Sequence, residues 1–188
     1  MKKSIIAFVS VLTLIFMLCG CQQETDVQRD TVNKQDELPK TSDIFDEIGR
    51  ADIFGEFYLD DEVAGYINEH PELFPTAEKE DIKDEDLKEF SYKKFNKTRA
   101  QDEIGLVKLD LYAAQVFEDD FNDGKLTSIL AVDEEFNYYA IYYTDSVEVY
   151  DEDEFTVYAL PCATSNFDNI GGGTTNVVVM IASYIEVY

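Results

Sequence analysis

"IGLVKLDLYAAQVFED" occupies residues 104–119, and its apolar and polar side chains alternate. Val107, Leu109 and Leu111 are separated from one another by a lysine and an aspartate. In an extended chain successive side chains point to opposite faces, so this period of two predicts a half-buried strand. The strand is long enough to bend and to pair with two different neighbours.

Four more strands are predicted after it. The dipeptide Asp123-Gly124 marks the turn of a hairpin. "LTSILAVDEE" and "FNYYAIYYTD" predict the second and third strands, joined by a tight turn near Glu134 and Glu135. "EFTVYALPC" predicts a fourth strand that Pro161 stops, and "TTNVVVMIASYIEVY", rich in β-branched residues, predicts a fifth.

Five strands without an internal repeat indicate the fold of residues 102–188. A sandwich usually has seven or more strands, whereas five suit a small barrel. We therefore expect a mainly β protein with short N-terminal helices (α+β), built around a five-stranded OB-like Greek-key barrel.

The region before the barrel, residues 43–101, is predicted to hold short helices and a charged connection. Apolar residues recur there at helical spacing in two places. Asp60 and Asp61 are favourable N-cap residues, and Pro71 ends the second helix. Lysines and an arginine gather near the end of the connection, where they either face a membrane surface or offset the surrounding acidic residues.

Residues 1–20 have the features of a lipoprotein signal peptide. Two lysines precede an apolar run that is too short to span a bilayer comfortably. "LCGC" at residues 18–21 resembles the lipobox of bacterial lipoproteins, which implies cleavage after Gly20 and a lipid thioether on Cys21. Two or more acyl chains give stable anchoring. An ordinary secretory signal or an uncleaved helix, with Cys21 incidental, is the alternative.

Residues 21–42 contain no aromatic residue and no apolar period, so they predict a disordered tether. Together with the lipobox, this places the folded part at the extracytoplasmic face of a bacterial cell membrane, attached through lipid. No pool of ATP or NAD exists there, so we expect no cofactor.

The net charge of −25 excludes one class of partner. A field of this sign repels nucleic acid and favours cationic partners, divalent ions, or solubility alone. Cys162 is the one cysteine left after lipidation and cleavage, so no disulfide or cysteine zinc site is expected. We interpret Cys162 as a small buried residue in or beside a strand.

Residues from about 92 to 187 resemble the C-terminal OB-fold domain of exported lipoproteins of Gram-positive bacteria. The matching features are a first strand ending "AAQVFED", the hairpin "ILAVDEEFNYYAIYY", the acidic "DEDEFTVYAL", and the loop "TSNFDNIGGGTT" before the final strand. The resemblance implies a fold and a surface location, but no reaction.

The glycine-rich stretch "SNFDNIGGGTTNVVV", residues 165–179, is not a phosphate loop. No lysine follows Gly173, and a strand rather than a helix comes next. The glycines are therefore expected to relax the loop between strands four and five. In OB-folds this loop flanks the ligand groove, which makes Asn169 and Gly171 candidate ligand contacts.

The third strand carries aromatic side chains on both faces. Tyr138 and Tyr142 share one face, and Tyr139 and Tyr143 share the other. OB-folds stack sugars or bases on outer aromatics of strands two and three, so Tyr138 and Tyr142 are candidate ligand contacts. The alternative is that the outer tyrosines pack under the N-terminal helices.

No catalytic or metal-ligating residue is nominated. His70 is the only histidine, and no nucleophile-elbow motif is present. "DDFNDG" fails as an EF-hand because Phe121 and Leu130 fall at ligand positions, although a looser calcium site is left open.

The expected function is a non-enzymatic binding or accessory module for a glycan, a peptide or a partner protein. The alternatives are a hydrolase with paired carboxylates, and a structural or regulatory partner of a membrane complex. An outer face sealed by the helices would favour the partner role.

Overall fold

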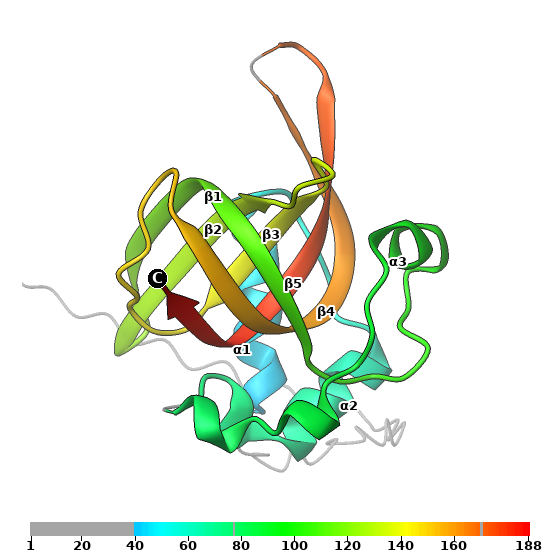
Figure 1. Cartoon of the computed structure of the whole chain (residues 1–188), viewed down its shortest axis with the longest axis vertical. Coiled ribbons are helices and arrows are strands. Elements are labelled where there is room, and N and C mark those ends of the chain that lie inside the picture. The colour runs from blue at the N-terminus through cyan, green and yellow to red at the C-terminus, as the bar shows by residue number, and fades with distance from the viewer. Residues whose placement is uncertain (1–39, 77, 170) are drawn as a thin grey trace, which may run out of the picture. The chain divides into compact units, whose positions relative to one another are not determined.

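The alternating stretch forms a long strand, β1 (Val107–Phe121), in a computed structural model that describes residues 40–76, 78–169 and 171–188. The other strands are β2 (Gly124–Val132), β3 (Tyr138–Tyr143), β4 (Glu154–Asp168) and β5 (Thr174–Val187). They close into a barrel in the order β1-β2-β3-β5-β4 (Figure 1). The pairing of β3 with β5 is parallel, and the other pairings are antiparallel. The predicted five-stranded OB-like barrel is confirmed.

β1 pairs with two neighbours, as its length predicted. Its first part, from Val107 to Tyr112, pairs with β4, and the rest pairs with β2. The register shifts between Ala113 and Gln115, where the strand passes from one neighbour to the other. Such a bulge bends and twists a strand, which helps the sheet to close.

The barrel interior is filled by apolar side chains from every strand. Tyr139, Ile141 and Tyr143 are the contributions of β3, and all three are buried. The interior cluster comprises Phe95, Val107, Leu111, Ala113, Ile129, Ala131, Tyr139, Ile141, Tyr143, Val149, Phe155, Val157, Ala159, Val178, Met180, Ala182 and Ile185.

Helix α3 (Tyr92–Thr98) closes one end of the barrel, in a place where the sequence predicted only a charged connection. Phe95 is 3% exposed and joins the interior cluster, with Phe90 packed beside it at 5.8 Å between ring centroids. A seven-residue helix is not stable alone, so packing against the barrel, rather than helix propensity, explains α3.

Two helices precede this connection, as predicted. They are α1 (Thr41–Arg50) and α2 (Asp61–Glu69). The Asp60 carboxylate accepts a hydrogen bond from the Val63 N–H at 2.8 Å and caps α2. After α2 come three short 3-10 turns, η1 (Pro71–Leu73), η2 (Lys79–Asp81) and η3 (Asp84–Asp86). α1 begins within the range predicted as tether; the predicted signal peptide, the anchor and residues 21–39 lie outside the described residues.

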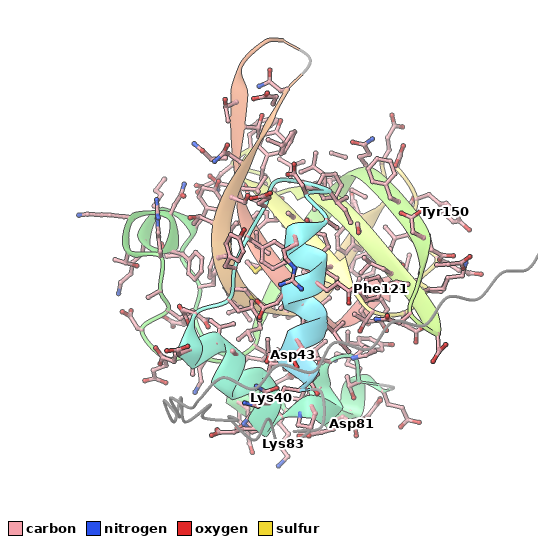
Figure 2. The ribbon with its side chains drawn as sticks, turned by 180° about the vertical axis from the view of Figure 1, so that it is seen from behind. Lys40, Asp43, Asp81, Lys83, Phe121 and Tyr150 are labelled. Atoms are coloured by element: carbon pink, nitrogen blue, oxygen red, sulfur yellow. The ribbon has the colours of Figure 1, made fainter. Side chains whose placement is uncertain are left out.

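The N-terminal helices cover the outer surface of the barrel. In Figure 2, which views the molecule from behind, α1 (cyan) lies over the strands. This outer-face cluster comprises Phe45, Ile48, Phe54, Phe57, Val63, Ile67, Phe74, Ile82, Leu106, Leu126, Leu130, Ala140, Tyr142, Tyr158, Leu160, Cys162, Val177, Val179 and Ile181. Both faces of β3 are therefore buried.

Two predicted boundaries are wrong. β4 does not stop at Pro161, which pairs with Met180 at a register shift, but continues to Asp168. The predicted long loop is thus a hairpin arm that projects from the barrel (Figure 1). Phe121 pairs with Gly124, so the β1–β2 turn lies one residue earlier than the sequence suggested.

Candidate functional site

Tyr142 does not face a ligand groove. Its side chain is 0% exposed, and its ring lies 5.3 Å from the Phe57 ring and 6.5 Å from the Phe54 ring between centroids. Burial raises the pKa of Tyr142 to about 12. The nomination of Tyr142 as a ligand contact is therefore wrong, because the N-terminal segment covers it.

Phe54 fills the outer groove between the two long hairpins. It stacks on Phe117 of β1 at 5.7 Å and lies 6.3 Å from Phe167 of β4. Gly55 follows with φ +94°, and a Cβ there would be 2.3 Å from the Asn166 carbonyl oxygen. The groove that OB-folds use for ligands is thus occupied by the chain itself.

The other nominated residues are placed differently. Tyr138 is partly buried against the outer-face cluster. Asn169 builds the tip of the β4–β5 hairpin: its side-chain oxygen accepts from the Gly173 N–H at 3.1 Å, and its side-chain nitrogen donates to the Thr175 hydroxyl at 3.2 Å. Gly171 is exposed in the same tip. The four residues do not form one surface, and a ligand role for Tyr138, Asn169 and Gly171 stays a prediction.

A different hollow opens at the barrel end that α3 covers. This cleft has a volume of about 580 Å³, within the range of ordinary ligand pockets. It lies between the start of α3, the start of β1 and the β2–β3 turn. Tyr92 and Tyr139 form an aromatic wall, with ring centroids 5.4 Å apart in an edge-to-face arrangement.

The β2–β3 turn at the rim of the cleft is held by Asp133. Its carboxylate accepts hydrogen bonds from the backbone N–H groups of Glu135 and Asn137, both at 2.9 Å. It also accepts from the Asn137 side chain at 2.8 Å and the Tyr139 hydroxyl at 2.9 Å. Burial alone would raise the pKa of Asp133, but these bonds outweigh it and lower the pKa below its usual value.

Phe136 stands at the tip of this turn with 80% of its surface exposed. Its φ of +61° is rare for an aromatic residue and costs conformational energy. The Asp133 hydrogen bonds hold the backbone in this conformation, so the ring is presented to solvent from a rigid support.

The cleft carries charges of both signs. Lys93 pairs with Glu135 at 3.4 Å across the rim. The Asp110 carboxylate accepts a hydrogen bond from the Thr156 hydroxyl at 2.5 Å. Lys88 and Lys94 likewise pair with nearby carboxylates, which supports the interpretation that the basic cluster offsets local acid.

Cys162 and His70, which could carry chemistry elsewhere in the molecule, pack against the fold instead. Cys162 is 3% exposed in β4, and burial raises the pKa of its thiol, so the prediction of a small buried residue is confirmed. His70 lies at the end of α2 against the Tyr66 ring. Within residues 40–76, 78–169 and 171–188, no three His, Cys, Asp or Glu residues are arranged to hold a metal ion.

None of the helices in these ranges has the length and apolar character of a membrane span. No family model, curated protein or solved structure matches the chain. Its function is therefore inferred from the geometry described above.

Proposed function

We propose that the protein is a lipid-anchored accessory module at the extracytoplasmic membrane surface, and that its ligand is a partner protein. The observation that carries this proposal is the sealed outer face. Phe54 and Phe57 cover Tyr142, so the aromatic surface that would stack a sugar is used for internal packing.

The anchor and the location rest on the sequence. The resemblance of residues 18–21 to a lipobox supports attachment through Cys21. The acidic composition supports a partner with basic surfaces and argues against nucleic acid.

A hydrolase with paired carboxylates has less support. Such an enzyme needs one carboxylic acid with a raised pKa to act as general acid. In the cleft, Asp133 has a lowered pKa and holds the turn. Asp110 is bonded to Thr156. With Glu135 paired to Lys93, three of the four carboxylates that line the cleft have structural partners.

The remaining surface suits protein recognition. Exposed aromatic residues on rigid supports are common anchors in protein interfaces. Phe136 meets this description, and the cleft beside it offers aromatic and charged groups that side chains of a partner can contact.

Site-specific photo-crosslinking in cells of the native host tests the proposal. A photoreactive phenylalanine analogue replaces Phe136 in one strain and Tyr150 in a control strain. Tyr150 is 67% exposed on the connection between β3 and β4. We expect a discrete protein adduct from position 136 and none from position 150. Absence of any protein adduct from either position, together with binding of purified protein to cell-wall glycan, would refute the partner role.

A further inference from the structure

The projecting β4–β5 hairpin has strand edges that the barrel does not pair. β5 pairs with β4 from Thr174 onward but with β3 only from Val178. β4 pairs with β1 only as far as Ala159. Beyond these points each strand of the arm has a ladder partner on one side and an edge on the other.

The hydrogen-bond pattern shows which groups face the β5 edge. At the tip, the Asn169 N–H donates to the Gly173 carbonyl at 2.7 Å. Hydrogen-bonded and non-hydrogen-bonded residue pairs alternate along an antiparallel ladder. Counting from the Asn169–Gly173 pair, Thr175 forms backbone hydrogen bonds with β4. Thr174 and Asn176 therefore direct their backbone N–H and C=O groups away from β4.

The Tyr92 hydroxyl confirms this orientation on β5, because it donates to the Asn176 carbonyl at 3.4 Å. The β4 edge is different, since the N-terminal segment covers it. The Ser165 hydroxyl donates to the Glu56 carbonyl at 2.6 Å, and Gly55 lies against Asn166. Helix α3 contacts β5, and its Tyr92 hydroxyl hydrogen-bonds to this edge, but Thr174 and Asn176 stay exposed. Among the described residues the β5 edge is therefore the more accessible of the two.

The barrel end of this edge lies beside the turn that carries Phe136. In the β3–β5 register Tyr139 lies opposite Val178, so the turn that precedes β3 lies next to the part of the edge nearest the barrel, around Asn176 (Figure 1). A strand added to Thr174 and Asn176 would pass the exposed ring. Extended peptides bind sheet edges in this way: main-chain bonds give affinity, and pockets for side chains give specificity.

We propose that the β5 edge from Thr174 to Asn176 pairs with an extended, basic segment of the partner protein, and that Phe136 inserts into an apolar site on that partner. The inference rests on the proposed function and names the partner's chemistry. Glu134 and Glu135 belong to the turn beside this edge, and Asp168 is the cross-strand neighbour of Thr174 on β4. Lys93 of α3 already pairs with Glu135.

Charge complementarity favours a basic partner segment on the β5 edge. Lysine or arginine side chains on the added strand would meet these carboxylates. A second copy of this chain would bring the same acidic groups together, and like charges on paired strands are destabilising. Self-pairing is therefore an outcome that the test must separate from partner binding.

The probes are seven-residue peptides added to the full-length protein in a neutral detergent. One alternates lysine and valine, one alternates glutamate and valine, and one is the lysine peptide with N-methylated backbone amides. We expect the lysine peptide to bind, and the other two to bind at least tenfold more weakly. We also expect slower hydrogen exchange of the Asn176 amide in its complex.

Two variants separate backbone pairing from side-chain effects. Asn176→Pro removes an outward N–H without touching the β4 ladder, and proline is tolerated at strand edges. Asn176→Ala keeps the N–H. We expect at least tenfold weaker binding for the proline variant, less than twofold change for the alanine variant, and about tenfold weaker binding for Phe136→Ala. Circular dichroism melting confirms that each variant is folded.

Equal binding of the methylated and unmethylated peptides, or equal effects of Asn176→Pro and Asn176→Ala, would overturn the inference. So would a dimer in sedimentation equilibrium that Asn176→Pro dissociates, since that result assigns the edge to a second copy. If the adducts from position 136 in cells persist when Asn176→Pro is also present, this inference is refuted, but the proposed function stands. Absence of adducts from both positions, together with binding of the purified protein to cell-wall glycan, would instead refute the proposed function.

Discussion

Phe54 and Phe117 stack with ring centroids 5.7 Å apart and planes inclined by 25°. Phe54 is 3% exposed, whereas Phe117 retains 40% of its surface. The N-terminal segment thus inserts one ring between the β1–β2 and β4–β5 hairpins, above Tyr142. The outer groove is therefore part of the hydrophobic core, and the surfaces left for binding lie elsewhere.

Phe54→Ala should lower the free energy of unfolding by about 3–5 kcal/mol, because removal of a buried phenylalanine loses burial and leaves a cavity. Urea unfolding monitored by circular dichroism measures the change. Phe136→Ala is the matched control, since the same atoms are removed from a ring that is 80% exposed; its effect should stay within about 0.5 kcal/mol. Similar losses in both variants would contradict burial of Phe54 in the groove.

Two glycine substitutions should change stability in opposite directions. Gly55 has φ +94°, and a Cβ would lie 2.3 Å from a carbonyl oxygen, so Gly55→Ala should destabilise the protein by at least about 1–2 kcal/mol. Gly65 lies inside α2, and a Cβ added there would have no atom within 4 Å, so Gly65→Ala should stabilise by roughly 0.5–1 kcal/mol. Thermal melting of both variants checks the signs, and a stable Gly55→Ala variant would refute the close approach.

The sequence predicts the barrel well because side-chain alternation is a local signal. β1, β2 and β3 begin and end close to the predicted positions. β4 is longer than predicted because the prediction assumes that proline interrupts a ladder. Here Pro161 lies at a register shift, which accommodates it.

The candidate site is less predictable because it depends on contacts between distant segments. The periodicity of β3 places Tyr138 and Tyr142 on one face, but it cannot show that Phe54, far away in the chain, covers Tyr142. α3 likewise forms through packing of Phe95 against the barrel. The β2–β3 turn does carry a readable signal, an aspartate and an asparagine flanking an aromatic residue, although we predicted no site from it.

Asp133→Asn should lower the free energy of unfolding by about 1–3 kcal/mol at neutral pH, because hydrogen bonds to a charged acceptor are weakened. The pKa of Asp133 is lowered in the folded state. Its contribution is therefore fully present above the unfolded pKa of about 4, and is lost as pH falls through the folded value. The variant should show a shallower loss of stability on acidification, measured by urea unfolding between pH 7 and pH 3.

Asp123→Asn is the control for the stability measurements at acidic pH, because Asp123 is an exposed carboxylate in the β1–β2 turn. It should leave the stability at neutral pH within about 0.5 kcal/mol of the original protein. If Asp133→Asn and Asp123→Asn have the same unfolding curves at every pH, the Asp133 hydrogen bonds do not stabilise the turn.

Tyr142→Phe should retain or raise stability, by up to about 1 kcal/mol, because the buried hydroxyl makes no hydrogen bond of normal geometry with the described residues. Burial raises the pKa of this hydroxyl more than its approach to the Phe54 backbone lowers it. The pKa of Tyr142 is raised to about 12. Stability linked to this group is present below the unfolded pKa of about 10 and falls as pH rises toward 12. The variant should therefore lose less stability than the original protein over this alkaline range. Destabilisation by Tyr142→Phe at pH 7 would show that the hydroxyl is satisfied.

Cys21→Ala tests the anchor, which lies outside the described residues. If Cys21 carries the lipid, the variant should move from the membrane fraction to the soluble extracytoplasmic fraction, or remain as an unprocessed precursor. The reason is that insertion of the acyl chains into the bilayer is what holds the protein at the membrane. Cys19→Ala is the matched control, two residues earlier in the chain, and should fractionate with membranes like the original protein. Cell fractionation with immunoblotting and metabolic labelling with an alkyne fatty acid measure both properties. Membrane retention of a processed Cys21→Ala protein, or label that survives this substitution, would show that another segment attaches the protein.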